Sequence, residues 1–135
     1  MVTWNLFNKT SKNESSEGNR RQKGNIAENN ACRYLRKRGL KILQRNYYCK
    51  GGELDIIARD SSHLVFVEVR IRKNSQFGGA LASVTTKKQK HLLHAAYCFM
   101  QQQKLNPAHQ ALRFDIIAIE QETDQIRWIK NAFGE

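Results

Sequence analysis

Apolar and polar side chains alternate through residues 51–72, and this pattern predicts two antiparallel strands joined by a tight turn. Ser61 and Ser62 can form the two-residue loop between the strands. That loop sets a register whose apolar face has three pairs: Leu54 opposite Val69, Ile56 opposite Val67, and Ala58 opposite Val65. A shift by one residue would place carboxylates among these apolar side chains, so the pattern favours this register.

The other face of the same hairpin carries charged side chains. The register predicts three pairs there: Ile57 opposite Phe66, Asp55 opposite Glu68, and Glu53 opposite Arg70. Opposed Cβ atoms lie about 4.5 to 5.5 Å apart, and like charges at that separation destabilise a sheet. A divalent cation between Asp55 and Glu68 would remove the repulsion, and Mg²⁺ prefers carboxylate oxygens. Arg70 points the same way as Glu68 and is placed to hold a phosphate beside that metal.

The flanking patterns predict two helices and three further strands. We expect helices at residues 25–38 and 86–104, and strands at residues 40–48, 112–120 and 125–131. Asn25 with Glu28, and Thr86 with Gln89, have the spacing of helix capping boxes, and this role would explain Glu28 completely. The Gly and Ser content of residues 73–84 predicts a loop. This loop is either an ordinary connection or a flexible segment that closes over a ligand.

Residues 1–23 are polar and lack periodicity, which predicts a flexible N-terminal arm. Residues 24–135 then form a single α/β domain, large enough to bury a core. The net charge of +11 and the pI near 9.9 indicate a polyanionic partner, with nucleic acid first and an acidic membrane surface second. The sequence has neither the apolar run of a membrane span nor that of a signal peptide, so we expect a cytoplasmic protein.

The cysteines and histidines do not predict a metal site. Cys32, Cys49 and Cys98 are widely spaced and form no CxxC motif, which favours buried, reduced thiols in a cytosolic protein. His91 and His94 lie on the predicted helix 86–104 without a nearby thiol or carboxylate partner. A zinc site is therefore not expected.

Six segments carry a combined motif: GNIAENNACRYLRKRGLKILQRN, GGELDIIARD, FVEVRIR, KKQKHLLHAA, RFDIIAI and the closing NAF. Together they resemble the YraN family of small bacterial proteins, which are predicted endonucleases. The resemblance runs from Gly24 to Phe133, and GELD, FVEV and RFD in that order are specific, although each alone is weak. The family is assigned to the restriction-endonuclease-like fold, similar to archaeal Holliday junction resolvases. In that fold a mixed β-sheet flanked by α-helices carries a PD-(D/E)xK site.

The resemblance implies roles for four residues. Asp55 and Glu68 would bind a catalytic Mg²⁺ or Mn²⁺, Glu28 would add a carboxylate, and position 70 would hold the basic residue of the site. The family usually has lysine there, in FVEVK, whereas this chain has Arg70. Arginine stays protonated, so it can stabilise phosphate charge but hardly act as a base, and the metal itself can acidify water. The similarity to resolvases also implies a homodimer.

Three functions fit these observations. The leading hypothesis is a Mg²⁺-dependent endonuclease that hydrolyses DNA phosphodiesters. Its contacts to the nucleic-acid backbone would come from Arg33, Arg36, Lys37, Arg72, Lys87 and Lys88. The cations near the helix ends also have structural alternatives, namely complementing a helix dipole or forming a solvated turn. The second hypothesis is a nucleic-acid-binding protein without turnover, and the third is a protein-interaction module, which alone predicts no salt-dependent DNA affinity.

Overall fold

The computed structural model of the chain describes residues 15–73 and 77–134. The elements follow in the order α1 (Ser15–Lys37), β1 (Lys41–Cys49), β2 (Gly52–Asp60), β3 (His63–Arg72), α2 (Phe77–Ala82), α3 (Thr86–Gln102), β4 (Ala111–Glu120) and β5 (Ile126–Phe133). The strands form one mixed sheet in the order β1-β2-β3-β4-β5, in which only β3 and β4 are parallel. This is the predicted single α/β domain with a mixed sheet flanked by helices, and it is consistent with a nuclease-like fold.

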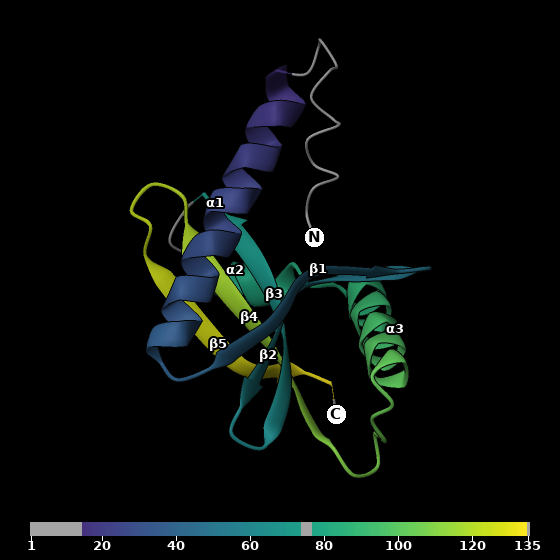
Figure 1. Ribbon diagram of the computed structural model, residues 1–135. Coiled ribbons are helices and arrows are strands. Elements are labelled where there is room, and N and C mark those ends of the chain that lie inside the picture. The colour runs from purple at the N-terminus through teal and green to yellow at the C-terminus, as the bar shows by residue number, and fades with distance from the viewer. Residues whose placement is uncertain (1–14, 74–76, 135) are drawn as a thin grey trace.

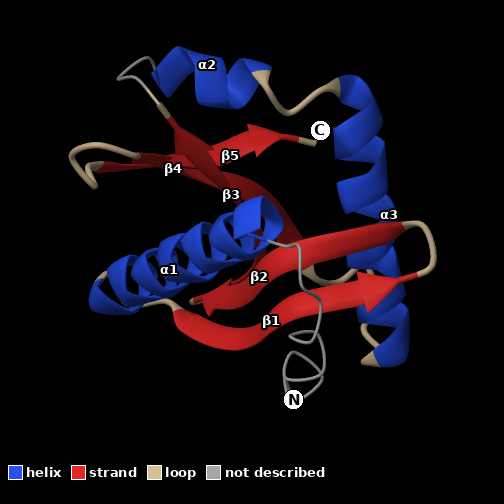
Figure 2. Ribbon diagram, turned by 90° about the horizontal axis from the view of Figure 1, so that it is seen from above, coloured by secondary structure: helices blue, strands red, loops and turns tan. Residues whose placement is uncertain are grey.

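The helices cover the sheet from both sides (Figures 1 and 2). On one side, α1 buries Ala31 and Leu35 against apolar side chains of β2, β3 and β4. On the other side, α3 buries Leu92 and Phe99 against a second apolar cluster. The crossover through α2 and α3 lets β4 return parallel to β3. Each face of the central strands is therefore buried under a helix.

The central hairpin has the predicted register close to its turn. Pairing extends from Asp60 opposite His63 to Ile56 opposite Val67. The three pairs predicted beyond that point are not part of the ladder in the described structure: Asp55 with Glu68, Leu54 with Val69, and Glu53 with Arg70. Two causes are visible, since β2 continues along β1 as far as Gly52, and the Asp55 side chain occupies the Val69 N–H.

The expected common face of Leu54, Ile56 and Ala58 is wrong at one position. Ile56 and Ala58 pack with α1, whereas Leu54 packs with Tyr47 in the cluster beneath α3. The change of side occurs where β2 parts from β3 and follows only β1. Asp55 lies at this point of divergence.

Helix α1 begins earlier than predicted. It starts at Ser15 instead of residue 25, so Asn25 lies inside the helix and does not cap it. The described side chains of residues 18–26 are exposed, and this part of the helix extends beyond the sheet (Figure 1). This part of the helix has no apolar face, so the periodicity of the sequence could not predict that it is helical. Residues 15–23 of the predicted arm are thus helical, and residues 1–14 lie outside the described residues.

The connection after β3 also differs from the prediction. Residues 77–82, expected to be loop, form the short helix α2. Thr85, not Thr86, caps α3, because its hydroxyl accepts the Lys88 N–H at 3.1 Å. Among the described residues, no helix combines the length and apolar character needed to cross a membrane.

Candidate active site

Asp55 lies where β2 and β3 separate, and its carboxylate bridges the two strands. Its Oδ2 accepts a hydrogen bond from the backbone N–H of Val69 at 2.9 Å. The side chain also forms a hydrogen bond with Glu68 on β3. The predicted proximity of Asp55 and Glu68 is therefore present, although their backbones do not form a ladder pair.

Glu68 is buried and has cations on one oxygen. Its Oε2 lies 3.0 Å from Nη2 of Arg70 and 3.7 Å from Nζ of Lys88, at the start of α3. The residue is only 6% exposed. Lys88 thus contributes a second cation beside the acidic pair, from a part of the chain that the PD-(D/E)xK pattern does not include.

The pKa values of both carboxyls are raised above their ordinary values. Burial first and the charge of Asp55 second raise the pKa of Glu68, and against the opposing charges of Lys88 and Arg70 the net result is about 7. Burial also raises the pKa of Asp55, while the Val69 N–H lowers it. The hydrogen bond between the carboxyls favours the ionised form of Asp55 and the protonated form of Glu68.

Glu28 approaches the pair from α1. Burial raises its pKa, the hydrogen bond from Arg45 lowers it, and the nearby charge of Asp55 raises it. Its Oε1 accepts hydrogen bonds from Nη2 of Arg45 at 2.9 Å and from Nδ2 of Asn46 at 3.0 Å. The capping-box interpretation of Glu28 is wrong, because Asn25 is within the helix. Glu28 instead joins α1 to β1 next to Asp55.

Two arginines of β3 add unsatisfied donors on the Glu68 side of the strand. The Nε atoms of Arg70 and Arg72 are buried and have no hydrogen-bond partner among the described residues. A Cβ at Gly79 of α2 would come 3.0 Å from Nη2 of Arg72, so this glycine permits the close packing of Arg72. Phosphate oxygens are suitable acceptors for such guanidinium groups.

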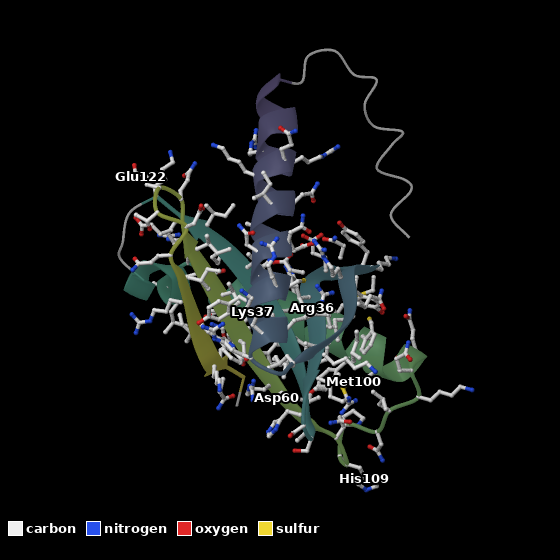
Figure 3. The ribbon with its side chains drawn as sticks, turned by 60° about the vertical axis from the view of Figure 1, so that its left-hand side comes forward. Arg36, Lys37, Asp60, Met100, His109 and Glu122 are labelled. Carbon is white, nitrogen blue, oxygen red and sulfur yellow. The ribbon has the colours of Figure 1, made fainter. Side chains whose placement is uncertain are left out.

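The remaining predicted contact residues are more dispersed. Lys87 is exposed beside Lys88 on the first turn of α3. Three exposed cations lie on α1 after Glu28: Arg33, Arg36 and Lys37. Figure 3 shows Arg36 and Lys37 near the end of that helix. At about 1.5 Å per residue, Arg36 lies about 12 Å along the helix axis from Glu28. None of their described contacts reaches the acidic pair.

The donor set of the pair fits a hard divalent cation. Val69 donates to Oδ2 of Asp55, and the cations of Arg70 and Lys88 contact Oε2 of Glu68. The other two carboxylate oxygens, Oδ1 and Oε1, take no part in these three contacts. Burial and the charge of Asp55 raise the pKa of Glu68, so a cation between the two carboxylates would offset both effects. Mg²⁺ binds through one or two carboxylates together with water and phosphate oxygens. Asp55 and Glu68 are the residues that would hold it.

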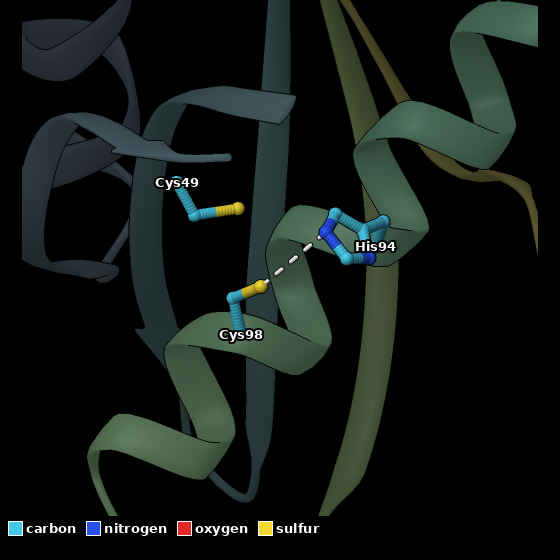
Figure 4. Close-up of side chains that lie close together, drawn as sticks. All are labelled: Cys49, His94 and Cys98. Carbon is cyan, nitrogen blue, oxygen red and sulfur yellow. Dashed lines mark hydrogen bonds between the residues drawn. The ribbon is translucent and has the colours of Figure 1, made fainter. Parts of the chain in front are cut away.

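Two further groups of polar side chains lie outside the acidic pair, one around Asp115 and one around His94. Asp115 is a fully buried carboxylate that accepts hydrogen bonds from Arg113, Trp128 and the Asn131 N–H. The expectation that His94 lacks a thiol partner is wrong, because Cys49 and Cys98 lie beside it (Figure 4). The spacing of His94 and Cys98 by four residues was a usable signal, since such residues share one helix face.

Comparisons with known proteins agree on one family. The family model described as "Uncharacterised protein family UPF0102" matches residues 27–119. A UPF0102 protein of Herminiimonas arsenicoxydans is 50% identical over 109 residues, which are 81% of this chain and 84% of that protein. A relative from Pseudomonas fluorescens is 45% identical over 112 residues (83% and 92%), and one from Vibrio cholerae is 46% identical over 117 residues (87% and 96%). The chain therefore belongs to the UPF0102 family.

Proposed function

We propose that this protein is a metal-dependent endonuclease that hydrolyses phosphodiester bonds of DNA. One observation carries the proposal: Asp55 and Glu68, two buried carboxyls from different strands, are in contact beside Arg70 and Lys88. Paired acids with adjacent cations match a divalent metal and a phosphate together. The net charge of +11 supports a polyanionic substrate.

Each residue of the site has a defined task in this proposal. Asp55 and Glu68 hold Mg²⁺ or Mn²⁺, which when bound supplies Lewis acidity toward a phosphoryl oxygen and toward the attacking water. Arg70 and Lys88 stabilise the negative charge that develops on the phosphate. Arg70 stays protonated and so does not take the proton of the water. Glu28 completes the acidic side of the site and is fixed in place by Arg45 and Asn46.

The resemblance to the YraN family of predicted endonucleases gives the proposal its further details. It favours a restriction-endonuclease-like domain that acts on branched DNA as a homodimer. We further propose that the protein acts in the cytoplasm. The backbone contacts that we propose nearest the site come from Arg72, Lys87 and Lys88. Arg33, Arg36 and Lys37 would contact more distant phosphates, because they follow α1 away from the acidic pair.

A second candidate function is nucleic-acid binding without cleavage. The salt bridge of 3.0 Å between Arg70 and Glu68 favours it, because it occupies an oxygen of a proposed metal ligand. The arginine also replaces the lysine that the YraN pattern usually has. In this case the phosphate would bind to Arg70 and Lys88, and no metal would bind to Asp55 and Glu68.

The experiment that tests the proposal is cleavage of labelled DNA. Four-way junction, flap, single-stranded and plain duplex DNA are incubated with the protein and Mg²⁺ or Mn²⁺, and in parallel with EDTA. We expect metal-dependent cutting by the wild type and its loss in Glu68→Gln, which keeps the shape of the side chain. Glu122→Gln, in the exposed β4–β5 turn, is the matched control.

The outcomes separate the two candidates. Cutting that persists in EDTA or in Glu68→Gln would overturn the proposed active site. Salt-dependent binding of the same DNA without cutting, in either metal, would support the non-catalytic alternative instead. Absence of both binding and cutting would rule out both.

A further inference from the structure

A second group of metal-ligating side chains lies away from the acidic pair, where the turn after β1 meets α3. Cys49 is the last residue of β1, and His94 and Cys98 lie one helical turn apart on α3. Figure 4 shows the three side chains converging on one point between strand and helix. One ligand atom from each lies within 4.8 Å of the other two.

We propose that Cys49, His94 and Cys98 bind one thiophilic divalent metal ion, with Zn²⁺ the best match. Two thiolates and an imidazole are typical zinc ligands, and they exclude Mg²⁺, which prefers oxygen. In a tetrahedral site with ordinary Zn–S and Zn–N bonds, a sulfur and a nitrogen are about 3.6 Å apart. The Cys98 Sγ and His94 Nε2 atoms are 3.6 Å apart.

Two glycines of the β1–β2 turn, Gly51 and Gly52, allow the turn to lie close against α3. Gly51 has φ of 92°, and a Cβ there would lie 3.4 Å from the ring of His94. A Cβ at Gly52 would come 2.6 Å from the carbonyl oxygen of His91, a distance that would force the turn off the helix. The two glycines therefore let Cys49 reach α3, and the ligands are brought together by the fold before any metal binds.

Metal binding at this cluster has a simple proton balance. One Zn²⁺ displaces two thiol protons, forms two Zn–S bonds, and leaves the oxidation states unchanged. His94 Nε2 lies 2.9 Å from the Lys50 carbonyl oxygen, so binding through Nε2 moves its proton to Nδ1.

The ion would tie the β1–β2 turn to α3 with three protein ligands. The described residues supply no fourth side-chain donor to this cluster, so water or an external ligand completes the tetrahedron. Lys88, on the same helix, lies about 9 Å along the axis from His94 and contacts Glu68. The proposed zinc site is thus distinct from the acidic pair and does not depend on nuclease activity.

Cobalt substitution tests the proposal directly. The reduced, metal-free full chain is titrated with Co²⁺, and thiolate-to-cobalt charge transfer in the near ultraviolet and tetrahedral bands in the visible are recorded. We expect saturation at one Co²⁺ per chain, displacement by Zn²⁺, and at least a tenfold weaker affinity in Cys98→Ser and in His94→Gln. Cobalt on Asp55 and Glu68 would give no thiolate band, so the two sites are distinguishable.

Matched variants keep the test independent of folding. His91→Gln alters an exposed histidine on the same helix, and Cys32→Ala alters a buried thiol of α1, away from the cluster. Both variants should retain the spectrum. Circular dichroism identifies any variant that has not folded, and Cys49→Ser then replaces it. The proposal is overturned if the reduced wild type gives no thiolate band, or if folded Cys98→Ser and Cys49→Ser give the wild-type spectrum.

Discussion

The carboxylate of Asp55 accepts the backbone N–H of Val69 at 2.9 Å, at the point where β2 and β3 part. This bond takes the place of the next strand pair and fixes the Asp55 side chain against β3. Glu68, the residue before Val69, is thereby held in contact with it. The acidic pair is thus built by a side-chain-to-backbone bond and not by regular strand pairing.

This bond predicts a difference between two substitutions of Asp55. Asp55→Ala leaves the Val69 N–H without its acceptor, whereas Asp55→Asn keeps an oxygen there. We expect the alanine variant to have a free energy of unfolding lower by about 1 kcal/mol than the asparagine variant. Urea denaturation of the metal-free protein measures it. The control is the same pair of changes at Asp60, whose carboxylate, among the described residues, contacts the side chain of Arg113 and not a backbone N–H. Equal stability of the two Asp55 variants would contradict the proposed role of the bond to Val69.

The raised pKa of Glu68 predicts that metal-free protein loses stability as the pH rises. Its ordinary value of 4.5 rises to about 7 on folding, because of burial first and Asp55 second. The folded state therefore holds a proton that the unfolded state releases, and its stabilisation is complete below pH 4.5 and lost as the pH rises through 7. The loss amounts to about 3 kcal/mol.

Thermal or urea unfolding between pH 4.5 and pH 8 measures this effect. Glu68→Gln should have a shallower decline, with the remainder due to Asp55, and Glu122→Gln should follow the wild type. Saturating Mg²⁺ should reduce the decline in the wild type, because a bound cation offsets the negative charge that Glu68 gains when it loses its proton. An equal slope in Glu68→Gln and the wild type would show that the titration of Glu68 is not the cause.

The sequence predicted the hairpin correctly where alternation and a short turn act together. From Ile56 to Asp60, a single register buries every apolar side chain, so pattern and structure agree. Beyond Ile56 the prediction of regular pairs was wrong, because periodicity cannot show that an aspartate side chain will compete for a backbone N–H. The proximity of Asp55 and Glu68 was nevertheless predicted, since both lie on adjacent strands near the same level.

Substitution of Arg70 distinguishes charge stabilisation from proton transfer. If Arg70 stabilises the phosphate, Arg70→Gln should lower the single-turnover cleavage rate by about 100-fold, and Arg70→Lys should stay within about tenfold of the wild type. Arg59→Gln, nearer the β2–β3 turn, is the control. Unchanged cleavage in Arg70→Gln would remove Arg70 from the site, whereas cutting by Arg70→Lys alone would favour the non-catalytic function for the natural chain.

Lys87 provides a test of the DNA contact surface. We expect Lys87→Gln to weaken DNA binding and to reduce the slope of log affinity against log salt by about 1, because one phosphate contact is lost. Lys104→Gln, beyond the other end of α3, removes the same charge as a control. Fluorescence anisotropy over a salt series gives both slopes. Identical slopes for the two variants would contradict the placement of DNA beside Lys87.

Other features required the three-dimensional structure. The first turns of α1 are exposed, so they carry no apolar stripe from which a helix could be predicted. Lys88 was predicted only as a backbone contact, because its distance to Glu68 depends on how α3 packs. Cys49 joins His94 and Cys98 through a tertiary contact between two elements, which cysteine spacing along the chain does not encode.

The most direct test of the acidic pair is a titration with Mn²⁺, followed by electron paramagnetic resonance of the free ion at pH 8. We predict that the wild type and Glu122→Gln each bind one Mn²⁺ that Mg²⁺ displaces, and that Glu68→Gln binds at least tenfold more weakly. Cys98→Ser should bind Mn²⁺ like the wild type, because the hard ion does not depend on thiols. Equal binding by Glu68→Gln and the wild type, or no binding by either, would contradict the assignment of Asp55 and Glu68 as a metal site.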